Sequence, residues 1–411
     1  MKDHNDSPSV PTGYKLTEVG VIPEDWGVSQ VGRTCTQVTT GKLDANAMVE
    51  NGAYRFYTCA KNYYLIDSYA FDCEALLISG NGAHVGYVHY YNGKFNAYQR
   101  TYVLSGFKSA IKYVQHYLEK NFRNRIQVEV RAGGTPYITR DTITESPIPL
   151  PPTEVEQCAI ATALSDVDAL LDGLDRLIAK KRDLKQAAMQ QLLTGETRLP
   201  GFDGEWEVKR LGDHVTFLRN GVNSRAELTL DDPVKYLHYG DIHSCTSVML
   251  DPASLPSLPS CKAKTLERLR DGDLVFADAS EDLVGVSKSV EISNLGDAEL
   301  VAGLHTIAAR FDKAVLADGF KAYLQFCPAF SCHLRRLAAG TKVYATNRSH
   351  IASVEMRLPG IKEQEAIAST FNDMDAEIAA LEQRRTKTKD IKQTMMQELL
   401  TGRIRLLPTT P

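Results

Sequence analysis

The sequence predicts an α+β protein: two similar mixed domains separated by two long helices, which pack as an antiparallel coiled coil and give the single chain a pseudo-twofold arrangement. Two observations support this prediction. The phrase QQLLTGETRL at 190–199 returns as QELLTGRIRL at 397–406, and the regions in front of both copies are rich in short β-branched and aromatic runs. A period of 207 residues is far longer than the roughly 20–50 residues of a solenoid unit, so it indicates a duplicated domain.

Composition places the chain among ordinary globular proteins. Its 411 residues are enough for two or three domains, and its 43% hydrophobic and 24% charged residues are typical of a folded protein. No stretch approaches the about 20 apolar residues of a membrane span, and the first residues lack the apolar segment of a signal peptide. We therefore expect a cytoplasmic protein with no membrane partner. The net charge of −4 is unusual for a nucleic-acid-binding protein, because such proteins are mostly basic.

The duplication sets the predicted domain boundaries. Residues 156–199 and 363–406 are identical at 21 of 44 aligned positions, and the two tryptophans, Trp26 and Trp206, coincide at a shorter offset of 180. The order is therefore variable region, constant segment, variable region, constant segment. We expect a first globular domain over 1–150 with 1–12 disordered, a first long helix over 151–196, a second globular domain over 197–357, and a second long helix with its tail over 358–411.

The two constant segments are predicted to be helices of about 40 residues, or about 60 Å. Prolines precede each segment and Thr-Gly follows it, which are start and stop signals for a helix. Apolar residues alternate four and three apart, which makes a narrow coiled-coil seam, so we expect the helices to bury it against each other. The predicted pairing residues are Ile160, Leu164, Val167, Leu171, Leu174, Ile178, Ile367, Phe371, Met374, Ile378 and Leu381.

The variable regions are predicted to be mixed domains. Runs such as EALLISG, RTYVL and LHTIAARF alternate with glycine and asparagine turns, which favours strands. The amphipathic stretches IKYVQHYLEKNF and ADGFKAYLQFCPAF are predicted to add one or two helices to each domain.

Signatures of catalysis are missing from the sequence. It contains no phosphate-binding G-x-x-x-x-G-K-[ST] loop, no H-E-x-x-H, no G-x-S-x-G and no Asn/Asp-Pro-Pro-aromatic motif. The acidic stretch 271–283 is a poor candidate for Mg²⁺, since its counterpart at 71–83 keeps few carboxylates. The eight cysteines include no C-x-x-C pair. We therefore predict no catalytic residue, no bound metal and no cofactor bound by this chain.

Tyrosines are concentrated in the first variable region, where ten of the eighteen lie between Tyr54 and Tyr102 among Lys, Asn, Gln and Arg residues. Each tyrosine offers a rigid ring and a hydroxyl, so this density is typical of polar recognition surfaces. The alternative is that these tyrosines pack the sheet.

Several motifs together resemble one known family. PLPPTEVEQCAIA at 149–161 and LPGIKEQEAIA at 358–368 each lead through a long helix into LLTG, and GYKLTEVGVIPEDW at 13–26 is echoed by GFDGEW at 201–206. In these features the chain resembles the specificity subunit of type I restriction–modification enzymes over nearly its whole length. It departs from the family pattern at 359–361, where Pro-Gly-Ile replaces the usual double proline.

The resemblance implies a DNA sequence-recognition subunit that is not itself an enzyme. It implies two target-recognition domains, each reading one half of an asymmetric, bipartite target, with the paired helices as a spacer. The implied partners are double-stranded DNA, two modification subunits that methylate adenine with S-adenosylmethionine, and restriction (motor-nuclease) subunits that use ATP and Mg²⁺. Those subunits would share the phosphate contacts that dominate affinity, which reconciles the role with the chain's net charge.

Direct base reading needs side chains that pair with base edges, so we expect it from polar and aromatic loop residues of the variable regions. In the first domain the predicted DNA-binding residues are Lys61, Asn62, Tyr63, Asn81, His84, Gln99, Arg100, Thr135 and Arg140. In the second they are Arg219, Asn220, His238, Tyr239, Ser280, His305, Lys342, Tyr344 and Asn347.

Two other functions are compatible with the sequence. One is a coiled-coil scaffold or adaptor with protein-binding globular ends and no role on DNA. The other is a nuclease or methyltransferase in its own right. A neighbouring gene for a methyltransferase with an Asn-Pro-Pro-aromatic motif would favour the restriction role, and its absence would favour the scaffold.

Overall fold

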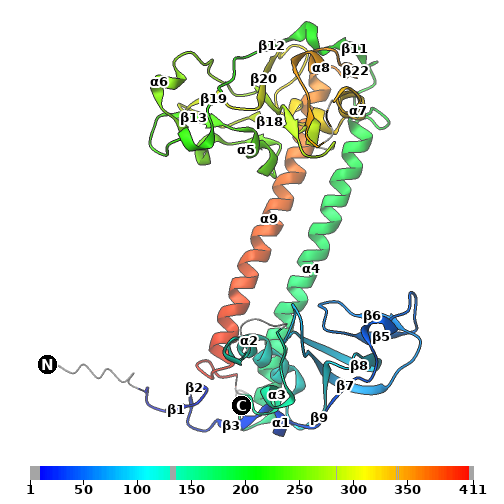
Figure 1. Cartoon of the computed structure of the whole chain (residues 1–411), viewed down its shortest axis with the longest axis vertical. Coiled ribbons are helices and arrows are strands. Elements are labelled where there is room, and N and C mark those ends of the chain that lie inside the picture. Colours follow the sequence, from blue (N-terminus) through cyan, green and yellow to red (C-terminus); the bar gives the residue numbers. More distant parts are fainter. Residues whose placement is uncertain (1–9, 130–135, 284, 339, 341, 407–411) are drawn as a thin grey trace, which may run out of the picture. The chain divides into compact units, whose positions relative to one another are not determined.

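The computed structural model describes residues 10–129, 136–283, 285–338, 340 and 342–406, and it divides into two compact units (Figure 1). Unit 1 is made of Met1–Arg176 and Glu382–Pro411, and unit 2 of Leu177–Leu381. Most of the segment expected to be disordered, 1–12, lies outside the described residues. Within the described part of the chain, no helix is both long and apolar enough to cross a lipid bilayer.

The described part of unit 1 combines many short strands with three shorter helices. Its strands are β1 (Tyr14–Thr17), β2 (Gly20–Pro23), β3 (Gly27–Gln30), β4 (Cys35–Thr40), β5 (Tyr54–Tyr57), β6 (Tyr64–Ile66), β7 (Phe71–Ser79), β8 (Val88–Ala97), β9 (Thr101–Phe107) and β10 (Pro147–Leu150). Its shorter helices are α1 (Val31–Thr34), α2 (Ile111–Glu129) and α3 (Arg140–Thr144), with one 3₁₀ turn, η1 (Ala45–Ala47).

A six-stranded sheet in the order β4-β9-β7-β8-β5-β6 forms the centre of unit 1. Its neighbours pair antiparallel except β5 and β8, which are parallel. Side chains alternate between the two faces because successive residues of a strand point in opposite directions. Leu76 and Ile78 join the larger core, which includes α2, whereas Ala75 and Leu77 join a smaller core on the other face.

Unit 2 has more and shorter strands. They are β11 (Glu207–Arg210), β12 (Val215–Phe217), β13 (Val234–Leu237), β14 (Met249–Leu250), β15 (Ser257–Leu258), β16 (Leu274–Ala277), β17 (Ala279–Ser280), β18 (Ser289–Ile292), β19 (Glu299–Ala302), β20 (Thr306–Phe311), β21 (Tyr344–Ala345) and β22 (Glu355–Leu358). The helices are α5 (Tyr239–Ser244), α6 (Ser260–Ala263), α7 (Pro328–Leu337) and α8 (Arg348–Ala352). The 3₁₀ turns are η2 (Leu211–His214), η3 (Arg225–Glu227), η4 (Pro252–Ser254), η5 (Gly285–Ser287) and η6 (Lys321–Phe326).

A five-stranded sheet in the order β12-β20-β16-β18-β14 forms the centre of unit 2, beside a three-stranded sheet in the order β15-β13-β19. Leu274 and Phe276 point to the core that contains α7, and Val275 and Ala277 to a second core. The amphipathic stretch at 317–330 forms two short helices, η6 and the start of α7. Pro328 opens α7, because proline lacks the N–H that would continue a helix and is tolerated in a first turn.

Two helices of 39 residues each, α4 (Glu154–Leu192) and α9 (Ile361–Leu399), contribute to both units (Figure 1). Within each unit they run antiparallel. In unit 1, Asp168 of α4 pairs with Lys392 of α9 at 2.5 Å, and Asp175, two turns later, pairs with the earlier Arg385. In unit 2, Lys185 pairs with Asp375 at 2.5 Å, which is the counterpart of the Asp168–Lys392 pair, and Lys181 pairs with Glu377 at 2.7 Å.

The eleven residues predicted to pair the helices are all removed from solvent to some degree. Ile160, Leu164, Leu174, Ile178, Ile367, Phe371 and Ile378 are buried, and Val167, Leu171, Met374 and Leu381 are half-buried. Towards the helix ends the seam merges with the domain cores: Ile160 shares the core of unit 1 with Leu399, and Ile367 shares that of unit 2 with Leu192.

The repeated phrase forms a compact junction in unit 1. Arg405 donates to both oxygens of Glu156 at the start of α4, at 2.5 and 2.8 Å, and to both oxygens of Asp25 at 2.9 and 3.0 Å. Its guanidinium lies 5.6 Å from the ring of Trp26. Gly402 has a φ of 70° and packs so close to that ring that a Cβ would lie 3.1 Å from it. Only glycine fits this site without strain.

The same junction is built a second time in unit 2. Arg198 donates to both oxygens of Glu363 at the start of α9, at 2.5 and 2.6 Å, and lies 5.6 Å from the ring of Trp206. Gly195 has a φ of 74° and packs against the same ring. Each repeated phrase therefore follows one long helix and binds the beginning of the other.

Candidate nucleic-acid interface

The loops that follow β5, β7 and β8 meet in unit 1. The carbonyl of Arg100 accepts from the Gly80 amide at 2.9 Å and from the Cys59 thiol at 3.4 Å, and the carbonyl of Gly80 accepts from the Ile138 amide at 2.9 Å. A Cβ on Gly80 would lie 2.3 Å from the Arg100 carbonyl oxygen, so this close approach requires glycine. Loops that carry predicted residues are thereby held close together.

Most of the predicted residues of the first domain are accessible. Lys61, Asn62, Tyr63, Gln99, Arg100 and Arg140 are exposed and Asn81 and His84 are half-buried, whereas Thr135 lies outside the described residues. Lys61 and His84 line one cavity of about 290 Å³ together with Arg123 of α2, which sequence reasoning missed. This grouping of a lysine, an arginine and a histidine can bind a phosphate or a guanine edge.

An arginine close to two tyrosine rings lies on β5, the strand that leads into the first of these loops. The guanidinium of Arg55 lies 4.3 Å from the ring centre of Tyr63 and 4.5 Å from that of Tyr91, and donates to the Tyr57 hydroxyl at 3.4 Å. Burial raises the pKa of Tyr57, so its hydroxyl stays protonated. Tyr63 remains 45% exposed, which leaves part of its ring free to stack on a base.

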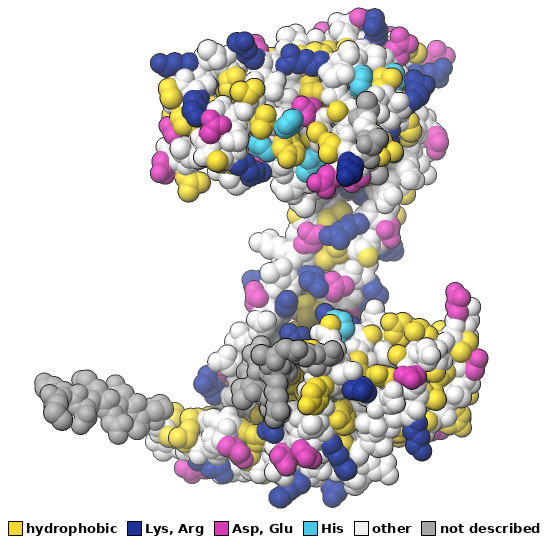
Figure 2. Space-filling view, in the orientation of Figure 1, with side chains coloured by type: hydrophobic (Ala, Val, Ile, Leu, Met, Phe, Trp, Pro, Cys, Tyr) yellow, Lys and Arg dark blue, Asp and Glu magenta, His cyan; other side chains and the backbone are white. Residues whose placement is uncertain are grey.

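In unit 2 the structure brings Tyr239, Ser280 and His305 together around a cavity of about 530 Å³, with His243 and Asp282 also in its wall. The rings of Tyr239 and His305 meet edge to face with 5.5 Å between their centres. Figure 2 shows histidine side chains gathered among hydrophobic ones on the visible face of this unit. Such a wall offers ring faces for stacking and carboxylates that can accept from the amino group of cytosine.

The backbone of His305 adopts the left-handed conformation, with a φ of 56°. Non-glycine residues rarely adopt it, and such positions cluster at functional sites. The imidazole Nδ1 lies 3.1 Å from a carboxylate oxygen of Asp278, and the ring is 53% exposed. The turn thus presents the ring at the cavity while Asp278 orients it.

The other predicted residues of the second domain have varied surroundings. Arg219, Lys342 and Asn347 are exposed, Asn220 and Tyr344 are half-buried, and His238 and Ser280 are buried. His238 caps α5: its Nδ1 accepts from the Gly240 amide at 3.2 Å, and burial lowers its pKa. Asn347 caps α8 in the same way by accepting from the His350 amide at 3.0 Å. For both, the visible role is local structure, and contact with DNA stays a prediction.

Several polar residues near these surfaces were not predicted. Arg123, His243, Asp282, Tyr137 and Arg348 lie beside predicted residues. Tyr137 forms a β-bridge with Asn81 and is 59% exposed, and Arg348 donates to the Asn220 side chain at 3.4 Å. No motif marks them, because their proximity arises from contacts between distant segments of the chain.

The acidic stretch at 271–283 has structural partners. Asp273 is 2% exposed, and its carboxylate accepts from the Arg310 guanidinium at 2.9 and 2.7 Å. The Asp282 carboxylate accepts from the Gly285 amide at 2.7 Å. These contacts occupy oxygens that a Mg²⁺ ion would need.

Comparison with known proteins finds similar proteins of one kind. Residues 23–180 match the family described as "Type I restriction modification DNA specificity domain". The chain is 35% identical over 181 residues to the Escherichia coli type I restriction enzyme EcoDI specificity subunit, a match that covers 43% of this chain and 40% of that relative. It is 24% identical to the Methanocaldococcus jannaschii type I restriction enzyme MjaVIII specificity subunit, with 94% of both chains covered.

A solved structure has the same fold over almost the whole chain. The S subunit of the type I restriction-modification system of M. genitalium superposes with a TM-score of 0.62 and 14% sequence identity, covering 97% of this chain and 99% of that one. At this identity the likeness concerns the fold: two α+β units with two long helices.

Proposed function

We propose that the chain is a specificity subunit of a type I restriction–modification system, and that it recognises a bipartite DNA sequence with two target-recognition domains. One observation supports this most directly: the Glu-Arg-Trp junction occurs in both units, whereas the polar cavity of unit 1 is lined by Lys61, His84 and Arg123 and that of unit 2 by Tyr239, His305 and Asp282. A protein that reads two different half-sequences needs a repeated scaffold, here the two long helices with their junctions, and different surfaces on the two units. A scaffold with two copies of one task would not need that divergence.

The partners follow from the same duplication. The two long helices with their junctions form two similar binding surfaces, which can bind two copies of one partner. We assign these surfaces to two modification subunits that carry S-adenosylmethionine and methylate adenine. Restriction subunits that use ATP and Mg²⁺ complete the complex. This chain is its non-catalytic recognition subunit, and double-stranded DNA is its ligand.

Exchange of one variable region tests the proposal. Residues 27–148 are replaced by the corresponding region of another specificity subunit, the modification subunit is coexpressed, and methylated adenines are mapped across the host genome. We expect one half of the target to change and the other half to persist, and the reciprocal exchange of 207–355 should do the opposite. If both halves change in each exchange, the two units read DNA jointly, and the modular account is wrong.

Point variants separate base reading from phosphate binding. Replacing Arg100 by Ala should relax specificity at one base pair if its side chain pairs with a base, at a cost of about 1–3 kcal/mol. Replacing Lys61 by Ala should weaken all sequences alike and reduce the salt dependence of binding if it contacts a phosphate. Lys180, exposed on α4, is a matched control whose replacement should alter neither property.

A further inference from the structure

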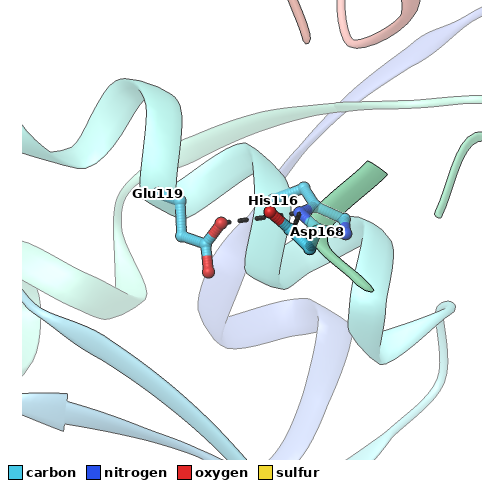
Figure 3. A group of neighbouring side chains, drawn as sticks. All are labelled: His116, Glu119 and Asp168. Carbon is cyan, nitrogen blue, oxygen red and sulfur yellow. Dashed lines mark ion pairs between the residues drawn. The ribbon is translucent and has the colours of Figure 1, made fainter. Parts of the chain in front are cut away.

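A buried histidine with an unsatisfied ring nitrogen lies in unit 1, away from the loops discussed above. His116 of α2 is 2% exposed, and its Nδ1 forms no hydrogen bond. That nitrogen faces two carboxylates: Oε2 of Glu119 at 3.5 Å and Oδ2 of Asp168 on α4 at 3.8 Å (Figure 3). The nitrogen thus has two acidic neighbours but no hydrogen bond, and these three atoms are of the kind that bind a cation.

The remaining atoms of these three side chains are already anchored. Nε2 of His116 lies 3.2 Å from the Ser165 hydroxyl, and Oε1 of Glu119 accepts from the Gln115 side chain at 2.8 Å. Oδ1 of Asp168 binds the Lys392 ammonium at 2.5 Å. Each side chain therefore offers one atom, Nδ1, Oε2 or Oδ2, to a common point. Outer hydrogen bonds of this kind orient the ligands of protein metal sites.

The spacing of these three atoms suits a tetrahedral ion. All three lie within 4.8 Å of one another. Bonds of about 2.1 Å to nitrogen and oxygen place neighbouring ligands of a tetrahedral Zn²⁺ roughly 3.4 Å apart, close to the two distances from Nδ1. Glu119 and Asp168 also line a cavity of about 750 Å³, which gives water access to a fourth position.

Unit 2 supplies an internal comparison. The Asp168–Lys392 pair has its counterpart, 207 residues away in both helices, in Asp375 and Lys185. There, however, the Tyr323 hydroxyl donates to Oδ2 of Asp375 at 3.2 Å, so that oxygen already has a partner. The ion pair is common to both units, whereas the histidine and its unfilled position belong to unit 1.

We propose that Nδ1 of His116, Oε2 of Glu119 and Oδ2 of Asp168 bind one Zn²⁺ ion, with a water molecule as fourth ligand. One imidazole and two carboxylates are ligands that suit Zn²⁺ better than Mg²⁺, which prefers oxygen alone. The ion ties α2 of the recognition domain to the long helix α4. Lys392 stays on Oδ1 and lies 3.8 Å from Oε2 of Glu119, so its charge weakens the site without occupying it. This revises the expectation of no metal, for which the sequence offered only residues 3 and 52 positions apart.

Zinc titration of the tag-free, EDTA-dialysed full-length chain tests the proposal by calorimetry, with Co²⁺ absorption as a second readout. We expect one equivalent to bind, with no competition from Mg²⁺. Zinc should also raise the unfolding temperature reported by Trp26 in a Trp206→Phe background. His116→Gln and Glu119→Gln should abolish these effects.

Two further variants separate the site from general effects. His333 also contacts a serine hydroxyl, Ser353 at 2.9 Å, so His333→Gln is a matched control that should bind zinc like the parent. Lys392→Met removes a competing positive charge and should tighten binding roughly tenfold, a gain that a purely structural role for this lysine does not produce. The proposal is overturned if the parent binds no zinc, or if His116→Gln and Glu119→Gln bind it as the parent does.

Discussion

Replacing Arg405 by Met should destabilise unit 1 far more than the loss of a surface ion pair. Glu156 is completely buried, and each of its carboxylate oxygens accepts one N–H from Arg405. The substitution keeps much of the side-chain volume but leaves a buried carboxylate without its cation. Asp25, the other partner of Arg405, is 52% exposed and can return to water.

The size of the effect follows from burial. Removing one partner of a buried ion pair costs about 3–5 kcal/mol, because the remaining charge is uncompensated. An exposed pair contributes about 0.2–1 kcal/mol, and the pair of Asp175 with Arg385 is of that kind, with side chains 50% and 42% exposed. For a unit of roughly 200 residues, 1 kcal/mol shifts the unfolding temperature by about 2–4 °C. Arg405→Met should thus lower it by roughly 10 °C, and Asp175→Asn by about 3 °C or less.

The chain provides its own reporter for the measurement. Trp26 lies in unit 1 and Trp206 in unit 2, and they are the only two tryptophans. In a Trp206→Phe background, fluorescence during thermal or denaturant unfolding reports unit 1. The double variant Glu156→Gln, Arg405→Met should recover part of the loss, because the buried charge is removed together with its partner.

Two results would contradict this reasoning. Equal costs for Arg405→Met and Asp175→Asn would mean that the junction contributes no more than a surface pair. A double variant less stable than Arg405→Met would mean that the charge of Glu156 is stabilised by other groups.

Three further predictions concern other features of the chain. The first is the insertion of one heptad of helix-forming residues into both α4 and α9, at the point where each helix passes from one unit to the other. The insertion keeps the apolar spacing of the seam and adds about 10 Å of helix. Methylome mapping should then show the same two half-sequences, separated by a gap that is longer by about three base pairs. Burial raises the pKa of Glu291 to about 7, so folded unit 2 keeps a proton that the unfolded chain releases above its ordinary value of 4.5. Stability measured through Trp206 in a Trp26→Phe background should therefore fall by up to about 3 kcal/mol as pH rises from 4.5 to 7, and Glu291→Gln should flatten this dependence. Gly402→Ala should destabilise unit 1 by more than about 1 kcal/mol, whereas Gly13→Ala, where φ is 84° but no atom lies within 4 Å of the new Cβ, should cost only the backbone strain.

The long helices were predictable because their signals are local. Proline before each helix, Thr-Gly after it and apolar spacing within it are properties of neighbouring residues. The sequence did not show which other residues the apolar seam of these helices packs against. Ile160 and Leu399 belong to the core of unit 1 as well as to the helix pair, and spacing alone cannot distinguish a helix that packs on a helix from one that also packs on a sheet.

The recognition surfaces were predictable only as loops of the right composition. Lys61 and His84 were expected, but Arg123, which lines the same cavity, lies on α2, where sequence reasoning expects a solvated helix face. His238 was chosen for its polar ring, and the structure gives that ring a local task as the cap of α5. Helix caps and cavities depend on how separate segments of the chain pack together, and this packing cannot be predicted from a single stretch of sequence.

The residues that form the two junctions are repeated in the sequence, but the sequence alone does not show which acid pairs with which base. Glu156 and Glu363 are identical in the two copies, as are Arg198 and Arg405, so each copy contains one acid and one base. The obvious pairing joins the acid and base within one copy, at opposite ends of one helix of about 58 Å, which no ion pair can span. Once the helices are antiparallel, the only short pairing is between copies, Glu156 with Arg405 and Glu363 with Arg198. The chain therefore cannot be cut between its two copies without leaving both junctions half-built, and this is a physical reason for the same phrase to stand at the end of each helix.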